Sequence, residues 1–196
     1  SIFDIGANIG AHTLPMAKLV GKKGKVYAIE PTKYAYSKLT KNLLINKSLS
    51  KRVQSDQIML INNDGKGKVK DLYSSWPLSV RSKDEKRHSV HQGVLRTISG
   101  AGEVTLDDYV SMNNITSLDL IKLDVDGIED IILLGLEETL SKEHVCSVLV
   151  ESSLEYKESH NSINDTLKQN GFSLQQSEST NPNDPNSSCY NYIFIR

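Results

Sequence analysis

Short apolar segments alternate with longer amphipathic segments along most of this chain, and this alternation is the feature that most constrains its fold. Residues 2–5, 25–29 and 57–61 are predicted strands. Residues 33–46, between the second and third strands, carry apolar side chains near a 3.6-residue period, which indicates a helix. Parallel strands need crossover connections of this kind, so the alternation predicts an α/β fold with a doubly wound sheet.

The second half of the chain continues the alternation and then breaks it. The elements expected there are a short helix or turn, a strand, a helix, a strand, a helix and two strands, at residues 105–112, 117–125, 127–134, 145–151, 159–170, 172–176 and 190–196. In the last helix we expect Ile163 and Leu167 to face inward, and we expect Gly171 to end it. No helix separates the last two strands, which predicts a closing antiparallel hairpin.

Residues 66 to about 104 interrupt this pattern because they are polar and rich in Ser, Lys and Arg. The segment is too short and too polar for a core of its own, so we expect an insertion within a single domain that spans residues 1–196. The chain begins without Met and inside a predicted strand. We therefore expect the domain to be incomplete at its N-terminus.

The composition is that of a globular protein, with 38% hydrophobic and 24% charged residues. A net charge of −1 gives no reason to expect binding to nucleic acid. No apolar run approaches the roughly 20 residues that span a bilayer, and two cysteines cannot form a disulfide framework. We expect a cytoplasmic protein in which Cys146 is buried within the apolar run 145–150.

The first chemical signal is the loop Asp4-Ile5-Gly6-Ala7-Asn8-Ile9-Gly10, which joins the first strand to a helix. Small residues let the backbone come close to a ligand, and a helix start offers free N–H groups to an anion. Asn8 stands where a glycine could be, and Asn tolerates the left-handed conformation better than most residues. The loop lacks the glycine pattern of dinucleotide-binding proteins, and an ordinary tight strand-to-helix connection is the alternative.

The second signal is Glu30, which ends the second strand 20 positions after Gly10. A carboxylate at this place can accept hydrogen bonds from the two hydroxyls of a ribose. The alternative is a solvated acid at a strand end. Together with the loop, Glu30 favours a nucleoside ligand.

The third signal is the acidic segment 120–129 at the end of the fourth strand. Ligands of open α/β sheets bind outside the carboxyl ends of the strands, so acids there are candidates for function. Asp126 and Glu129 have the spacing of a helix N-cap and its capping-box partner, so both can be largely structural. We expect Asp124 to face the site.

Four segments in this order, FDIGANIGAHT, VYAIEP, VTLDDYV and LIKLDVDGIEDIILLG, resemble the signature segments of the FkbM family of S-adenosylmethionine-dependent methyltransferases. The family usually has Glu at the position of Asp126. The resemblance implies a class I methyltransferase (Rossmann-like) fold: a seven-stranded, mostly parallel sheet with a closing antiparallel strand and helices on both faces. It also implies methyl transfer to a hydroxyl oxygen of a sugar, a glycan or another small metabolite.

Carried over by position, the resemblance places the loop residues around the methionine part of S-adenosylmethionine and Glu30 on its ribose. Two residues after the third strand are candidates for the adenine end. The backbone around 124–127 would flank the amino group and the methyl group. The predicted cofactor-binding residues are Asp4, Gly6, Ala7, Asn8, Gly10, Glu30, Asn62, Asp64 and Asp126.

A base can remove the hydroxyl proton while the new bond forms. Asp124 is our first choice for this catalytic base and Glu151, at the end of the fifth strand, the second. His12, His88 and His91 are alternatives. We predict no metal, although the carboxylates are suitable ligands for a hard cation.

Two other functions stay open on the sequence. One is a nicotinamide-dependent oxidoreductase of Rossmann type, and the other is a non-catalytic protein that binds a nucleoside. The missing glycine pattern counts against the oxidoreductase.

Overall fold

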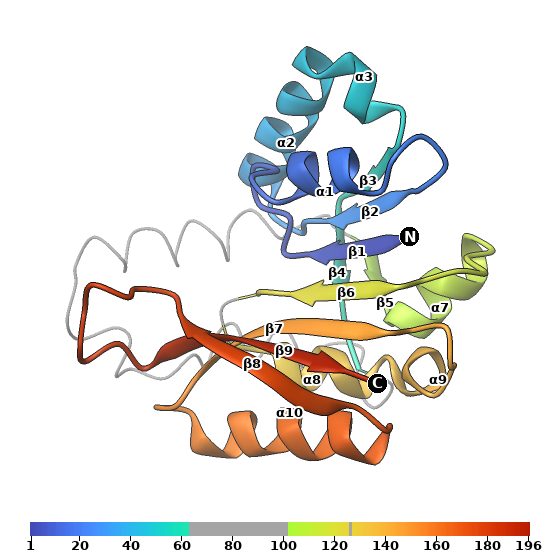
Figure 1. Ribbon diagram of the computed structural model, residues 1–196. Coiled ribbons are helices and arrows are strands. Elements are labelled where there is room, and N and C mark those ends of the chain that lie inside the picture. The colour runs from blue at the N-terminus through green and yellow to red at the C-terminus, as the bar shows by residue number, and fades with distance from the viewer. Residues whose placement is uncertain (63–101, 126) are drawn as a thin grey trace.

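The computed structural model describes residues 1–62, 102–125 and 127–196. Within these residues, seven strands form one sheet in the order β3-β2-β1-β6-β7-β9-β8 (Figure 1). Their bounds are β1 Ile2–Ile5, β2 Val26–Ile29, β3 Val53–Asp56, β6 Leu120–Leu123, β7 Ser147–Ser153, β8 Ser173–Ser179 and β9 Cys189–Ile195. The first five of this order run parallel, and β9 is antiparallel to both β7 and β8. The expected class I sheet and its closing hairpin are confirmed.

A strand is present at the predicted place, 57–61, but it is not the third strand of the main sheet. The strand beside β2 is β3, whereas β4 (Ile58–Leu60) leaves the sheet and pairs in parallel with β5 (Gly102–Val104). The reason is that β3 lies at a sheet edge and is half-buried, so its VQSD sequence lacks an apolar signal. Met59 and Leu60 are apolar because they pack into the core. The strand β5 falls in the last residues of the expected insertion, and 63–101 lie outside the described residues.

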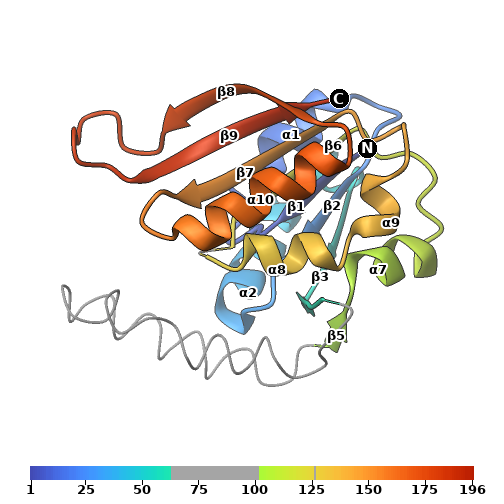
Figure 2. The ribbon, with the colours of Figure 1, turned by 90° about the horizontal axis from the view of Figure 1, so that it is seen from below.

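The helices are α1 Thr13–Leu19, α2 Lys33–Ile45, α3 Lys47–Ser50, α7 Leu106–Met112, α8 Glu129–Leu134, α9 Glu137–Leu140 and α10 Lys157–Gln169. Side chains of α1 and α2 pack on one face of the sheet, and those of α7 to α10 pack on the other. Figure 2, seen from below, shows α8 and α10 side by side in front of the strands. We did not predict α3 and α9, because a single helical turn carries no periodicity. In the described part of the chain, no helix has the length and apolarity that crossing a membrane requires.

The predicted facing of α10 is confirmed, because Ile163 and Leu167 are buried. Gly171 follows its C-terminus with a φ of +84°, the left-handed conformation that ends many helices. In α2 the same periodicity buries Leu39 and Leu43, whereas Leu44, which follows Leu43, is exposed.

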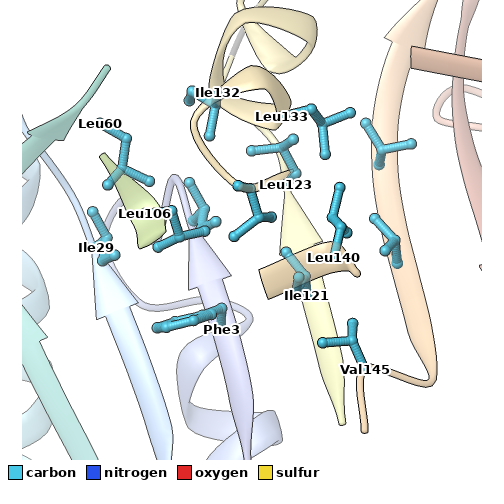
Figure 3. Close-up of a cluster of buried hydrophobic side chains, with 14 of the residues drawn as sticks. Phe3, Ile29, Leu60, Leu106, Ile121, Leu123, Ile132, Leu133, Leu140 and Val145 are labelled. Atoms are coloured by element: carbon cyan, nitrogen blue, oxygen red, sulfur yellow. The ribbon is translucent and has the colours of Figure 1, made fainter. Parts of the chain in front are cut away.

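The main core lies between the sheet and the second helical layer (Figure 3). Alternate strand residues point into it, among them Phe3 from β1 and Ile121 and Leu123 from β6. They meet Leu106 at the start of α7 and Leu133 of α8. This packing fixes the parallel strands in register, and their carboxyl ends therefore lie at one edge.

The prediction that Cys146 is buried is wrong, because its side chain is exposed. Val145 and Val148 on either side are fully buried. An apolar run predicts that a segment is part of the core. It does not show which side chains of that segment face solvent, because side chains of a strand alternate between its two faces.

Two adjacent leucines of α8 test the assignment of the core. Leu133 is fully buried and Leu134 is 39% exposed. Leu133→Ala should lower the free energy of unfolding by about 2–5 kcal/mol, because it leaves a cavity. Leu134→Ala has the same effect on helix propensity and should cost less than about 1 kcal/mol. Urea unfolding of both variants measures the difference, and equal losses would contradict the facing of this helix.

Candidate functional site

The parallel register brings four predicted site residues to one edge of the sheet. Ile5 is level with Ile29 on one side and with Leu123 on the other. Leu123 is in turn level with Val150. The residues that follow these four are therefore neighbours across the sheet, on adjacent strands about 4.8 Å apart: Gly6, Glu30, Asp124 and Glu151.

The strand order also reverses at this edge. From β1 the chain continues outward through β2, whereas from β6 it continues in the other direction through β7. Such a switch point opens a crevice at the carboxyl ends of the strands, and open α/β sheets bind their ligands there. Gly6 and Asp124 lie on the two sides of this switch point.

The glycine loop folds back over the end of β2. Its Gly6, Asn8 and Gly10 have φ values of +75°, +50° and +91°. The expectation that Asn8 takes the left-handed conformation is therefore confirmed. The backbone amides of Gly6 and Ala7 both donate to the Ile29 carbonyl at 3.0 Å. These bonds hold the loop at the switch point.

Gly6 is also required by the neighbouring strand. A methyl group at this position would overlap the backbone carbonyl oxygen of Asp124. The Asp124 amide donates to the Ile5 carbonyl at 3.2 Å, so the two loops are joined through their backbones. The glycine therefore permits a close approach of chain to chain, whatever ligand binds beside it.

Glu30 is not a solvated acid, because it is only 5% exposed and both carboxylate oxygens accept hydrogen bonds. Oε2 accepts from the Asn8 amide at 2.9 Å. Oε1 accepts from the amide and the hydroxyl of Thr32, at 2.8 and 2.5 Å. A carboxylate offers about four lone-pair sites, so one site on Oε2 is left for a further donor.

Thr32 was missed on the sequence. It stands at the N-cap position of α2, where a Thr normally bonds the helix amides. Here its side chain makes no cap hydrogen bond and turns to Glu30.

A small, shallow apolar recess lies beside Glu30 and opens to solvent. It is lined by the ends of β1 and β2, by β4 and by the start of α8, through Ile5, Gly6, Ile29, Pro31, Ile58, Met59, Leu60, Val125, Ile128 and Ile132. Asn62 follows β4, and its Oδ1 is buried with no hydrogen-bond partner within residues 1–62, 102–125 and 127–196.

Asp124 is held by a lysine that the sequence did not assign to the site. Lys122 Nζ lies 3.0 Å from Asp124 Oδ2 and 3.3 Å from Asp4 Oδ1. It also donates to the Gly6 carbonyl at 3.4 Å. The sequence does mark Lys122, because it is the only charged residue of its strand. Its partner Asp4 in β1 could not be predicted, because the pairing depends on the register of the two strands.

Asp4 does not line the recess. Its side chain is fully buried, and its Oδ2 accepts from the Thr13 hydroxyl at 2.5 Å. A direct contact with a cofactor is therefore not available to it. Thr13, also missed on the sequence, is the first residue of α1.

The loop after β6 is stabilised by Glu129. Its Oε1 accepts from the amides of Val125 and Gly127 at 3.0 and 3.1 Å. This supports a structural role, but the predicted cap is wrong, because the N-cap of α8 is Ile128. Asp126, the expected cap, lies outside the described residues, as does Asp64.

Glu151, the second candidate base, accepts a hydrogen bond from the Cys189 thiol at 3.0 Å. Burial, and then this hydrogen bond, raise the pKa of Cys189 to about 12, so the thiol stays protonated at neutral pH. His12 is exposed at the N-cap of α1, and His88 and His91 lie outside the described residues. Among the residues that the structure describes, no group of three His, Cys, Asp or Glu side chains is placed to hold a metal ion.

The close approach at Gly6 can be tested with a matched pair of glycines. Both Gly6 and Gly21 have positive φ values, but only Gly6 has a neighbour in the path of a methyl group. Gly21→Ala should cost about 1–2 kcal/mol, the penalty of the left-handed conformation. Gly6→Ala adds overlap with a carbonyl, worth about 1–3 kcal/mol or more, and should cost at least about 3 kcal/mol. Urea unfolding compares the two, and equal losses would show that the loops are free to separate.

Comparison with known proteins places this arrangement in a family. Residues 4–174 match the family described as the methyltransferase FkbM domain. The 2-O-methyltransferase NoeI of Sinorhizobium fredii (strain NBRC 101917 / NGR234) is 29% identical over 150 residues, which are 72% of this chain and 59% of NoeI. The chain thus spans less than two thirds of the length of this relative.

Solved structures share the fold at low sequence identity. The methyltransferase FkbM from Methylobacillus flagellatus KT superposes with a TM-score of 0.66 at 15% identity, over 98% of this chain and 43% of that one. The Aeropyrum pernix fibrillarin, a complex with natively bound S-adenosyl-L-methionine, gives a TM-score of 0.59 at 12% identity, over 99% and 65%. These likenesses confirm the class I methyltransferase fold. With the match across most of its length, the chain belongs to the FkbM methyltransferase family.

Proposed function

We propose that this chain is an S-adenosylmethionine-dependent O-methyltransferase whose acceptor is a hydroxyl group of a sugar, a glycan or another small metabolite. The observation that carries the proposal is the junction of Glu30 with the glycine loop at the switch point, beside an apolar recess. The free acceptor site of Glu30 suits a donor such as a ribose hydroxyl, and the glycine loop beside it leaves room for the rest of a nucleoside ligand.

The family match and the S-adenosyl-L-methionine found in the fibrillarin neighbour support the cofactor. Gly6, Asn8 and Gly10 would follow its methionine part, and the remaining acceptor site of Glu30 would take a ribose hydroxyl. The recess and Asn62 would take the adenine. When bound, S-adenosylmethionine supplies an electrophilic methyl group.

The charge of the site suits a cationic cofactor. Asp4, Asp124 and Glu30 contribute three negative charges, and Lys122 contributes one positive charge. Opposite charges attract strongly in a partly buried site, where water screens them weakly. The net negative charge therefore favours binding of a sulfonium.

Asp124 is the base that we propose. Lys122 holds its Oδ2, whereas its Oδ1 has no partner in the described ranges, and the side chain is 29% exposed. When the methyl group moves from sulfur to the acceptor oxygen and leaves S-adenosylhomocysteine, the free carboxylate oxygen of Asp124 would accept the hydroxyl proton. The larger part of the catalysis is the placement of the hydroxyl in line with the methyl group.

Two observations bear on the class of the acceptor. The relative NoeI is named a 2-O-methyltransferase, which favours oxygen as the methylated atom. The net charge of −1 favours an acceptor other than nucleic acid. Glycan, sugar and small-metabolite acceptors remain alternatives within the proposal.

Calorimetry with S-adenosylhomocysteine and with NAD tests the cofactor class directly. We expect binding of S-adenosylhomocysteine and no heat with NAD. The reverse result would replace the methyltransferase with the oxidoreductase alternative. Binding without methyl transfer to any of a panel of hydroxylated acceptors would favour a non-catalytic nucleoside-binding protein.

Glu30→Gln tests the ribose contact without removing the side chain. The amide keeps one oxygen but loses the charge, so affinity for S-adenosylhomocysteine should fall by about 1.5–3 kcal/mol, or about tenfold or more. Glu143→Gln makes the same change at an exposed position before β7, at the opposite edge of the sheet, and should leave the affinity unchanged. Equal affinities of the two variants would remove Glu30 from the site.

Asp124→Asn tests the base, because it keeps the shape and removes the basicity. Turnover at saturating cofactor should fall by roughly 10²–10⁴, the usual worth of a general base, and cofactor affinity should fall much less. Glu151→Gln is the comparison and should keep most of its turnover. If Asp124→Asn loses affinity but keeps turnover, Asp124 positions the methionine part instead, and Glu151 becomes the candidate base.

A further inference from the structure

We propose that Lys122 is a positioning residue that holds Asp124 and the glycine loop in one arrangement, and that Asp4 is its buried anchor. The proposal rests on the proposed function, because it concerns how the site of that reaction is organised. Neither residue touches the apolar recess. Lys122 contacts Gly6, which lines the recess, and Asp124, and Asp4 contacts Lys122.

Asp4 and Lys122 belong to a row of polar side chains that runs from α1 over two adjacent strands to the site. Thr13 of α1 donates to Asp4 of β1, Asp4 lies against Lys122 of β6, and Lys122 reaches Asp124 beyond the strand's end. Asp4 is fully buried and the Lys122 side chain is 4% exposed. Asp124 alone reaches solvent.

Burying these charged side chains lowers the stability of the fold, so we expect the arrangement to serve a function. Taking charges out of water costs several kcal/mol per ion, and a buried ion pair is often no more stable than apolar residues of the same volume. Asp4 and Lys122 stand between buried apolar residues in both strands, where an apolar pair would pack well. The function of the pair is therefore expected at Asp124, the one residue of this row that reaches solvent.

The lysine also connects the two loops of the site. Beyond its contact with Asp124, Nζ donates to the carbonyl of Gly6. The same two residues meet through their backbones, where Gly6 packs against the Asp124 carbonyl. One ammonium group thus fixes the loop that would hold the methionine part relative to the carboxylate that would accept the proton.

Lys122→Met alone would leave Asp4 buried without a cation, and the protein would be at risk of unfolding. The test therefore uses Asp4→Asn as the background and adds Lys122→Met to it. Affinity for S-adenosylhomocysteine, measured by calorimetry, should be at least tenfold weaker in the double variant than in Asp4→Asn. Lys168→Met, added to the same background, removes an exposed lysine of α10 and should change the affinity less than twofold.

A purely electrostatic role for Lys122 gives the opposite result. Removing a positive charge beside the site would leave the affinity unchanged or make it tighter. Either outcome in a folded double variant would overturn the proposal.

Turnover provides a readout that a merely structural role would not move. Within the Asp4→Asn background, Lys122→Met should lower kcat at least tenfold and leave the KM of the acceptor within about threefold. When Asp124→Asn is also present, the further effect of Lys122→Met on kcat should disappear, because the lysine acts through that carboxylate. Independent effects of the two substitutions would overturn the proposal.

Failure of the proposed function gives a different pattern. If the unsubstituted protein binds no S-adenosylhomocysteine, the methyltransferase proposal fails, and the lysine is tested by stability alone. In the Asp4→Asn background, the shifts in urea midpoint caused by Lys122→Met and Asp124→Asn should then be non-additive, because the residues are in contact. Additive shifts would show that Lys122 does not hold Asp124.

Discussion

Parallel pairing of β1 with both β2 and β6 is the constraint on which the rest of the structure depends. It brings Glu30 and Asp124 to the same level on either side of Gly6, although they are 94 positions apart in the chain. The connections on the two sides leave in opposite directions, so nothing in the sheet closes the space above this edge. A site at this place is therefore a consequence of the topology, and its chemistry is set by the few side chains that reach it.

The residues at this edge also hold one another in place. Glu30 ties the glycine loop to the start of α2 and keeps one acceptor site for a ligand. Gly6 lets the glycine loop approach the loop after β6, and its amide donates a hydrogen bond to the Ile29 carbonyl. Glu129 holds the amides of the loop after β6. A site built from shared contacts of this kind is held in position before any ligand arrives, which is what a reaction that depends on placement requires.

The fold and the edge of the site could be predicted from the sequence for a simple reason. Strand alternation, the helical period and the residues that end strands are local patterns, and they located Gly6, Glu30 and Asp124. The polar strand β3 could not be found this way, because it lies at an edge and is only half-buried. The exposure of Cys146 was missed because an apolar run does not show which of its side chains face the core.

The sequence by itself determined the class of the fold, the glycine loop and the carboxylates at the strand ends, because these depend on short stretches of chain. Only the tertiary structure showed that Asp4 is buried against Thr13 and Lys122, that Thr32 bonds Glu30 and not its own helix, and that Lys122 reaches Asp124. Each of these depends on burial or on which strands lie side by side. Burial and strand neighbours are properties of the packed sheet, and a local pattern cannot specify them.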